Sequence, residues 1–392
     1  MTPQTRPSST SIYLDHGATS WPKPDVVSAA LADAVVNFGG NPGRGAYKLA
    51  LDTARAIHSA RANIASFLGV PDAKDLLFQP GCTQAMNLVL FGLLRPGDRV
   101  VVGFAEHNAV ARPLNMLAAR GVEVVLAPPD AHGIVDADEV DALVRRAPTR
   151  AVVCQHAGNL TGAIQPVIDL ADIAHEHEAL LLVDGAQAGG HLPVDLRALG
   201  ADAWACSGHK GLLGPQGIGV LYLAPGCDPE ELVAGGTGAG QSEQPLQPRV
   251  RPDRYEAGTP NTPGLLGLGA SISWLAEHAE EQRALETALT RRLHEGLLAL
   301  GGFRVLGPEL DEPRVPIIAA VHDTVAVDRL AFALDRRYGI ATRGGLHCAP
   351  WAHDALGTLT SGALRFGVGY GNTAEQIDAT LAALAEIVQD ES

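Results

Sequence analysis

Residues 151–187, AVVCQHAGNLTGAIQPVIDLADIAHEHEALLLVDGAQ, contain the pattern that decides the fold. Two short apolar runs, at 151–155 and 179–184, flank a helix-length segment at 167–177. Strands that are apolar at nearly every position and alternate with helices are typical of a mostly parallel sheet covered on both faces. The stretch therefore predicts an α/β fold.

The same alternation continues on both sides of this stretch. Further strands are expected at 76–78, 99–104, 122–127, 203–207 and 219–223, with helices at 83–94, 109–120 and 136–146. Ligands of such sheets bind beyond the C-terminal ends of the strands. The loops that follow these strands are therefore the places where we expect functional side chains.

Beyond residue 260 the pattern predicts a smaller α+β region. Helices are expected at 263–300, 326–337 and 373–388, with strands at 303–306, 315–321 and 364–369. We predict a flexible tail at 1–11, a large domain at 12–260 and a small C-terminal domain at 261–392, with the first residues of the large domain packing on the small one. The long Gly/Pro/Gln segment at 235–253 is predicted to be a functional loop.

Composition excludes several classes of function. The chain has 392 residues, 46% of them hydrophobic, and a net charge of −15. An acidic protein of this kind is not expected to bind nucleic acid or an anionic membrane, and no apolar run approaches the roughly 18 residues of a membrane span. The cysteines are scattered without a C-x-x-C pattern, which predicts a reducing, cytoplasmic location. They are Cys82, Cys154, Cys206, Cys227 and Cys348.

Lys210 is unusual because the chain otherwise prefers arginine. Only four of the 29 basic residues are lysines, which leaves 29 − 4 = 25 arginines. Lys210 lies in the glycine-rich segment SGHKGLLG, directly after the predicted strand at 203–207. A primary amine can form a Schiff base with an aldehyde cofactor, and a guanidinium cannot. The alternative interpretation is a surface lysine or one that contacts a phosphate.

The neighbours of Lys210 favour pyridoxal phosphate (PLP). Asp184 directly follows a buried strand, where a carboxylate can pair with the protonated pyridine nitrogen and keep the ring electron-withdrawing. Gln187 is placed to bond the phenolic oxygen of the ring. The alternative for Asp184 is an ordinary turn or capping residue.

A phosphate cradle is predicted at LLFQPGCTQAMNLVL (76–90), which reads as strand, glycine turn and helix. Thr83 occupies the expected N-cap position, where the helix amides can bind a phosphate. Ser207 and His209 are expected to close around the same phosphate. The alternative is an N-cap without a ligand.

Two further loops carry polar side chains after strands. His107 in FAEHNA could stack on the ring and shuttle protons. Asn159 in HAGNLTG could meet a ring oxygen or a substrate carboxylate. Taken alone, His107 is better explained as a structural histidine.

Seven motifs together carry a family resemblance: SGHKGLLGPQGIGVLY, VDGAQ, AEHNA, NLTG, EAGTPNTPG, RGGLHCAP and LRFGVGYGNT. With them, the chain resembles the cysteine desulfurase/selenocysteine lyase family of class V aminotransferase-like PLP enzymes of fold type I. The resemblance runs from YLDHGATSWPKP to NTAEQID. The stretch RGGLHCAPWAH is similar to the branch with a short cysteine loop.

The resemblance implies a set of roles. Lys210 would carry the cofactor and act as a catalytic base, His107 would assist catalysis, and Cys348 would attack the substrate sulfur and become a persulfide. L-Cysteine would be converted to L-alanine, and the persulfide would pass to an acceptor protein or a small thiol. The implied cofactor-binding residues are Lys210, Asp184, Gln187, His107, Thr83, Cys82, Ser207, His209 and Thr259, and the implied substrate-binding residues are Arg365, Asn159 and Ala18.

Thr259 would reach the phosphate of a neighbouring subunit, which implies a homodimer with shared sites. Arg365 suits a carboxylate because a guanidinium binds it through two parallel hydrogen bonds. The alternative interpretation of Arg365 is that it forms a salt bridge within the small domain.

Cys348 lies in a candidate loop for a reactive thiol, with two glycines, Arg343 and His347 nearby. A reactive thiol should be exposed and should favour the thiolate. A rival interpretation makes His347, Cys348 and His353 metal ligands. Three loosely spaced ligands without a fourth form a poor zinc site, so we expect no metal.

Three departures from the family pattern leave the substrate open. His16-Gly17 stands beside the expected substrate position where Asn-Ala is usual, Tyr47 stands where histidine is common, and Cys82 replaces a small residue or threonine. A PLP-dependent C–S or C–Se lyase is the alternative enzyme. A non-catalytic binding platform of the same fold is the alternative from another class, and such a protein need not be yellow.

Overall fold

The computed structural model describes residues 11–43, 45–130, 132–238 and 243–391. The predicted tail at 1–11, apart from Ser11, therefore lies outside the described residues. The core is a seven-stranded mixed sheet with the strand order β2-β8-β7-β6-β5-β3-β4. The strands are β2 (Leu76–Gln79), β8 (Gly219–Leu223), β7 (Ala203–Ser207), β6 (Leu180–Asp184), β5 (Ala151–Gln155), β3 (Arg99–Gly103) and β4 (Glu123–Ala127).

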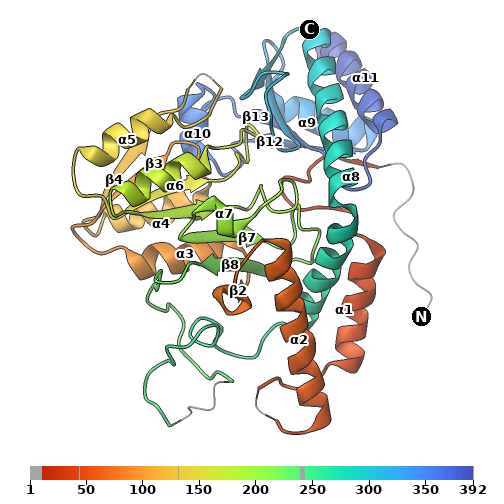
Figure 1. The fold of residues 1–392 in the computed structure, drawn as a ribbon. Coiled ribbons are helices and arrows are strands. Elements are labelled where there is room, and N and C mark those ends of the chain that lie inside the picture. The colour runs from red at the N-terminus through yellow and green to blue at the C-terminus, as the bar shows by residue number, and fades with distance from the viewer. Residues whose placement is uncertain (1–10, 44, 131, 239–242, 392) are drawn as a thin grey trace.

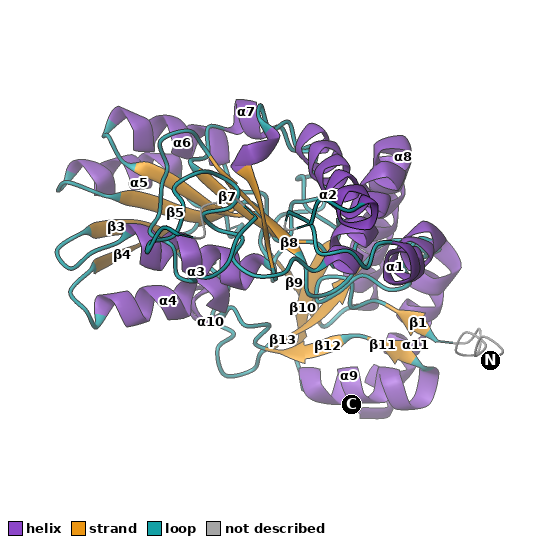
Figure 2. Cartoon of the chain, turned by 90° about the horizontal axis from the view of Figure 1, so that it is seen from below, coloured by secondary structure: helices purple, strands orange, loops and turns teal. Residues whose placement is uncertain are grey.

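Helices cover both faces of this sheet (Figure 2). One face carries α3 (Cys82–Leu93) and α4 (Asn108–Ala118), and the other carries α5 (Ala137–Arg145), α6 (Val167–Glu176) and α7 (Leu196–Leu199). Successive side chains of β3 enter different cores: Val100 and Val102 pack in the same cluster as residues of α3 and α4, whereas Val101 packs with residues of α5 and α6. Because both faces are covered, the strands are apolar at successive positions.

Long helices complete the molecule at one side. The helix α8 (Thr262–Leu300) packs along α1 (Asp25–Asn37) and α2 (Lys48–Phe67), and its C-terminal part reaches the second sheet (Figure 1). That sheet is antiparallel, with the order β12-β13-β10-β9. Its strands are β12 (Arg343–Gly345), β13 (Ala363–Gly367), β10 (Ile317–His322) and β9 (Phe303–Leu306), and its helices are α9 (Val327–Tyr338), α10 (Pro350–Ala355) and α11 (Ala374–Glu391).

The N-terminal segment joins this C-terminal part of the chain. Strand β1 (Ile12–Tyr13) pairs in parallel with β11 (Ile340–Ala341), and Asn372 Nδ2 donates to Tyr13 O at 3.0 Å. Residues 14–23 then run from the second sheet to the loop that contains Lys210, where Ser20 N donates to His209 O.

The predicted α/β class is confirmed, and the seven predicted strands of the large sheet are all present with ends that differ by at most one residue. The division into domains at residue 260 stays a prediction. The sequence patterns did not predict α1, α2, α7, α10, β1, β11 or β12.

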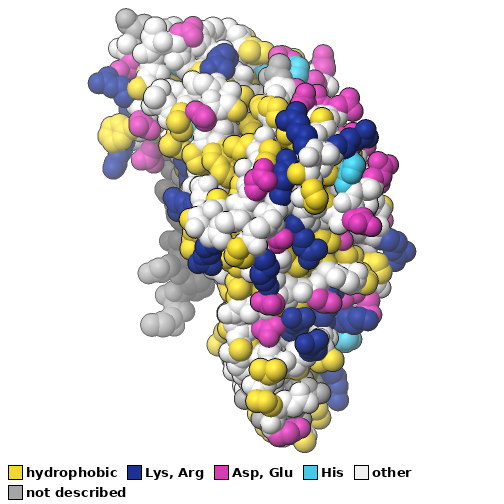
Figure 3. All heavy atoms as spheres, turned by 90° about the vertical axis from the view of Figure 1, so that its left-hand side faces the viewer, with side chains coloured by type: hydrophobic (Ala, Val, Ile, Leu, Met, Phe, Trp, Pro, Cys, Tyr) yellow, Lys and Arg dark blue, Asp and Glu magenta, His cyan; other side chains and the backbone are white. Residues whose placement is uncertain are grey.

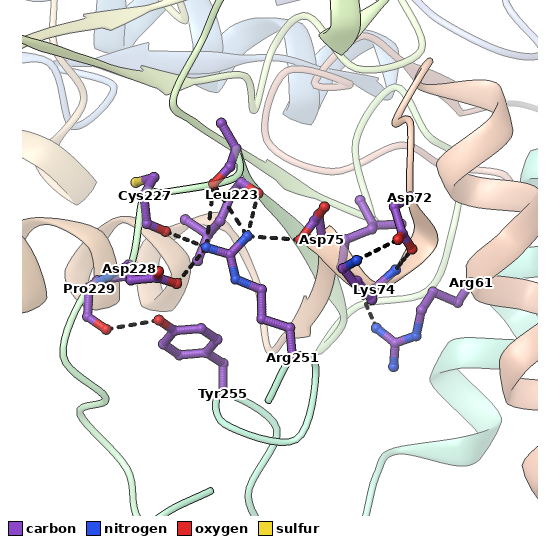
Figure 4. Close-up of polar contacts among 12 residues, drawn as sticks. Arg61, Asp72, Lys74, Asp75, Leu223, Cys227, Asp228, Pro229, Arg251 and Tyr255 are labelled. Carbon is purple, nitrogen blue, oxygen red and sulfur yellow. Dashed lines mark hydrogen bonds and ion pairs between the residues drawn. The ribbon is translucent and has the colours of Figure 1, made fainter. Parts of the chain in front are cut away.

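The segment between β8 and α8 has no helix or strand among its described residues. Arg251 ties this segment to the edge of the large sheet (Figure 4). Its guanidinium donates to Asp75 Oδ1 at 2.9 Å, to Leu223 O at 2.8 Å and to Cys227 O at 2.6 Å. Tyr255 OH donates to Pro229 O at 2.9 Å, which closes the segment on itself.

No helix within the described ranges is long and apolar enough to cross a membrane. On the face shown in Figure 3, acidic and basic side chains are interspersed among hydrophobic ones. The charges of that face therefore form no single large patch.

Candidate active site

A cavity of about 260 Å³ opens where β5, β6 and β7 end. All but one of the predicted site residues line it. They are Ala18, Cys82, Thr83, His107, Asn159, Asp184, Gln187, Ser207, His209, Lys210, Cys348 and Arg365. Segments from eight separate stretches of the sequence therefore converge on one site.

Lys210 follows β7 in a loop that requires glycines. A Cβ on Gly211 would lie 2.4 Å from Gly189 O, and a Cβ on Gly190 would lie 2.1 Å from Gly211 O. Close approach of these two backbone segments fixes the direction of the loop. Burial lowers the pKa of Lys210, and the negative charge of Asp184 opposes this shift. A lowered pKa increases the fraction of neutral, nucleophilic amine.

The N-terminal segment holds the Lys210 loop from the other side. Ser20 Oγ donates to Lys210 O at 2.9 Å, and Lys23 Nζ donates to Ser20 Oγ at 2.6 Å and to His209 O at 3.0 Å. Burial lowers the pKa of Lys23 to about 8. Sequence reasoning missed Ser20 and Lys23, because only the folded chain brings residues 20–23 to residue 210.

Asp184 ends β6 and is buried. Its Oδ1 accepts hydrogen bonds from Ala186 N at 2.9 Å and from Cys82 Sγ at 3.2 Å. Within the described part of the chain, Oδ2 has no hydrogen-bond partner. One oxygen of Asp184 is therefore held by the protein, and the other is available to a ligand in the cavity.

The phosphate cradle differs in detail from the prediction. Helix α3 begins at Cys82 with Gly81 as its N-cap, so Thr83 lies inside the first turn and is not the N-cap. Gly81 has no side chain to accept from the first-turn amides. Among the described residues, Cys82 N is the one first-turn amide that donates to a side chain, to Ser207 Oγ at 3.1 Å. An uncapped helix N-terminus that faces a cavity suits a phosphate.

His107 is the N-cap of α4, and its Nδ1 accepts from Ala109 N at 3.0 Å. This bond places the proton of the neutral ring on Nε2. Burial, and next to it the charge of Lys210, lower the pKa of His107 to about 4. Similar burial lowers the pKa of His209 to about 4. Both rings are therefore neutral at pH 7.

Two buried amides keep one oxygen without a partner. Asn159 Nδ2 donates to His347 O at 2.7 Å, and Gln187 Nε2 donates to Gly17 O at 2.8 Å. Among the described residues, neither Asn159 Oδ1 nor Gln187 Oε1 has a hydrogen-bond partner. Because both residues line the cavity, a polar ligand there would satisfy these oxygens.

Arg365 lies on β13 and is buried. Its Nη2 donates to Asp15 Oδ1 at 3.0 Å, while Arg343 Nη2 lies 3.2 Å from Asp15 Oδ2. Gly17 borders the same group: a Cβ at residue 17 would lie 3.2 Å from Arg365 Cζ. Sequence reasoning missed Asp15, which pairs with both arginines; among the described residues, Arg365 Nε has no hydrogen-bond partner.

Cys348 is exposed and lies at the opening between β12 and α10. His347 and Cys348 both have a left-handed backbone, with φ values of 48° and 56°. Consecutive non-glycine residues rarely adopt this conformation, so other contacts must hold them. Asn108 N donates to Cys348 O at 2.7 Å, and Asn159 Nδ2 bonds the preceding carbonyl.

Three residues lie away from the cavity of their own chain. The ring of His16 packs against Tyr13 and Gly369, and Tyr47 is 57% exposed at the N-cap of α2. Of the pair expected beside the substrate, Gly17 lines the cavity and His16 does not, and Tyr47 also lies outside it within this chain. Thr259 is exposed and lines a different surface hollow, next to Tyr255 and Pro260.

The rival metal interpretation has no geometric support. His347 Nε2 is 2.8 Å from Ala363 O, and His353 Nδ1 is 2.8 Å from Thr358 Oγ1. Within the described ranges, no group of three or more His, Cys, Asp or Glu residues is arranged to hold a metal ion.

The fold and the cavity define a PLP-dependent enzyme of fold type I. An amine, a carboxylate with one open oxygen, an uncapped helix N-terminus and a neutral imidazole form the donor set that this cofactor requires. The model of the family described as aminotransferase class-V matches residues 12–380. The chain belongs to this family.

Relatives and solved structures agree with this assignment. A probable cysteine desulfurase from Methanothermobacter thermautotrophicus is 35% identical over 96% of this chain and 94% of the relative. A cysteine desulfurase from Klebsiella pneumoniae is 34% identical over 96% of this chain and 93% of the relative. The apo structure of a cysteine desulfurase from Thermococcus onnurineus has a TM-score of 0.90 and 29% identity, covering 97% of this chain and 95% of that one.

Proposed function

We propose that this protein is a PLP-dependent L-cysteine desulfurase that produces L-alanine and a protein persulfide. The observation that carries the proposal is that exposed Cys348 lines the same cavity as Lys210, Asp184 and Arg365. When bound, PLP supplies an aldehyde that condenses with an amine and a ring that withdraws electrons. Lys210 would hold the aldehyde, Asp184 the pyridine nitrogen, and the start of α3 with Ser207 the phosphate.

The side chains divide the remaining chemistry. Arg365 would bind the substrate carboxylate, and Lys210 Nζ would take the proton from the substrate Cα; burial lowers the pKa of this amine, which increases its neutral fraction. The Cys348 thiolate then forms an S–S bond with the substrate sulfur while the C–S bond breaks. The electron pair of that bond stays with the carbon fragment, which gains protons and becomes alanine.

The decisive test uses Cys348→Ser on the PLP-loaded enzyme. We expect the visible cofactor absorption and its change on adding cysteine to persist, because these steps use Lys210, Asp184 and Arg365. Alanine formation should fall by about 100-fold or more, because a hydroxyl is a poor nucleophile toward sulfur and loss of a catalytic nucleophile removes most of the rate. The matched control is Cys227→Ala, which removes a buried thiol outside the cavity.

The alternative is a C–S or C–Se lyase that acts on a modified cysteine or on selenocysteine. The departures from the family pattern at His16-Gly17 and Tyr47 are the observation that favours it. If Cys348→Ser retains most of its activity on cysteine, the desulfurase mechanism is wrong and the lyase takes its place. A colourless protein that fails to bind PLP would instead support a binding platform.

We further propose a homodimer with shared sites, because Thr259 lies outside the cavity of its own chain while its segment is anchored by Arg251. Mixing Thr259→Ala with Lys210→Ala protein should restore activity after subunit exchange. Only a shared site leaves one centre with both residues intact. Mixtures that stay inactive after confirmed exchange would contradict sharing.

The same exposed thiol supports transfer of sulfur to an acceptor protein or a small thiol. We also propose a cytoplasmic location, which the five unpaired thiols favour because disulfides are rare in reducing compartments.

A further inference from the structure

Cys82 contributes a second thiol to the cavity, and the proposed reaction does not use this thiol. It opens helix α3 and lines the cavity, but only 4% of its surface is exposed. It also stands where the family pattern carries a small residue or threonine. The function of this thiol is therefore to be sought in the groups that it contacts.

The thiol is oriented as a hydrogen-bond donor to Asp184. Cys82 Sγ lies 3.2 Å from Asp184 Oδ1 and 3.4 Å from Ala205 O, and both of these atoms are acceptors. Burial, and next to it the charge of Asp184, raise the pKa of the thiol well above its usual range. The sulfur therefore keeps its proton and cannot compete with Cys348 as a nucleophile.

The bond acts on the carboxylate that faces the cofactor position. Asp184 Oδ1 accepts from Cys82 Sγ and from Ala186 N, so both donors lie on the same oxygen. They fix the rotation of the carboxylate and draw charge toward Oδ1. The oxygen left to the cofactor, Oδ2, is then less basic than in a carboxylate without donors.

We propose that Cys82 is a positioning residue that holds Asp184 through its thiol hydrogen bond and thereby tunes how strongly the bound cofactor retains its protons. The proposal rests on the proposed function only in requiring PLP in this cavity. It does not require that cysteine is the substrate.

The test is a pH titration of the visible absorption of the PLP-loaded protein without substrate. In Cys82→Ala, Asp184 loses a hydrogen-bond donor, so its Oδ2 oxygen carries more negative charge. This charge stabilises the protonated form of the nitrogens of the bound cofactor. We expect the pH midpoint of the absorption change to rise by roughly half a unit, since a thiol is a weak donor to a charged acceptor. Cys82→Ser, which restores a donor, should return the midpoint toward that of the unsubstituted protein.

Cys227→Ala is the matched control, because Cys227 is a buried thiol remote from Asp184, and its midpoint should not move. The titration follows only the loaded fraction, so incomplete occupancy of a variant does not obscure the result. An unchanged midpoint in Cys82→Ala would overturn the proposal. Equal shifts in Cys82→Ala and Cys82→Ser would also overturn it, because altered packing alone would explain them.

These outcomes are separable from the proposed function. Failure to form alanine from cysteine with an intact cofactor band would reject the desulfurase and leave the role of Cys82 standing. If the enzyme forms alanine from cysteine normally but the Cys82 variants do not shift the pH midpoint of the cofactor absorption, the desulfurase stands and the role of Cys82 is rejected.

Discussion

At the scale of single residues, the cavity holds two thiols in opposite environments. Cys82 is buried against a carboxylate, so its proton is retained, whereas Cys348 is exposed on a loop beside Arg343 and Arg365. Sulfur nucleophiles react as thiolates, so the buried thiol of Cys82, whose pKa is raised, is unsuited to attack, and a substrate can reach the exposed thiol of Cys348. The environment separates a nucleophile from a hydrogen-bond donor although the two side chains are chemically identical.

Lys210 is expected to be irreplaceable by arginine. Lys210→Arg keeps a cation in the loop but removes the primary amine, so the visible band of the bound cofactor should disappear. Absorption spectra of the purified variant incubated with PLP measure this directly. Circular dichroism should show an intact fold, because Lys210 donates no side-chain hydrogen bond within the described part of the chain. A borohydride-reducible adduct of PLP in Lys210→Arg would contradict the assignment.

At the scale of elements, the sequence patterns located the strands of the large sheet but not α1 or α2. Burial on both faces makes those strands apolar, which is a local signal. Helix α1 begins after Pro24 and α2 after Tyr47, and neither N-cap provides a side-chain hydrogen bond. A side-chain cap, the strongest start signal, is therefore absent from both helices, and both pack along α8.

The predicted site residues have local sequence signals, whereas the missed ones depend on contacts between distant parts of the chain. Asp184 and Lys210 follow strands directly, so their places follow from the rule for parallel sheets. Asp15, Ser20 and Lys23 enter the site only because β1 pairs with β11, a contact across more than 300 residues. Strand β12 contains two glycines in three residues, so its strand propensity is low and its pairing with β13 defines it.

A buried ion pair between Arg251 and Asp75 helps to anchor the segment between β8 and α8. The side chains of Arg251 and Asp75 are 9% and 8% exposed. Arg251→Met leaves Asp75 buried without its partner, and we expect a loss of about 3–5 kcal/mol in the free energy of unfolding. Urea denaturation followed by circular dichroism measures the change.

Arg292→Met is the matched control for this substitution, because Arg292 forms a similarly short pair with Asp378 on the surface. Exposed pairs contribute little, so its unfolding midpoint should stay close to that of the unsubstituted protein. Equal losses in the two variants would show that burial does not decide the strength of the Arg251 pair.

At the scale of the whole molecule, burial of neutral histidines couples stability to pH. Burial lowers the pKa of His16 to about 3, of His347 to about 3 and of His156 to about 4, all from an ordinary value of 6.5. The unfolded chain binds these protons below pH 6.5, and the folded chain does not until the lower values are reached. Their contribution to stability is therefore complete above pH 6.5 and is lost as the pH falls toward 3 to 4.

His16 offers the clearest test of this coupling, because among the described residues neither of its ring nitrogens has a hydrogen-bond partner and its ring lies outside the cavity. At pH 5, one such histidine lowers the free energy of unfolding by roughly 2 kcal/mol, since this pH lies 1.5 units below the pKa of histidine in the unfolded chain. The stability lost between pH 7.5 and pH 5, measured by urea denaturation at constant ionic strength, should be smaller by about this amount in His16→Asn. His58→Asn removes an exposed histidine from α2 and should leave the difference unchanged. If His16→Asn loses as much stability on acidification as the unsubstituted protein, the buried ring is already protonated or does not set the acid limit of the fold.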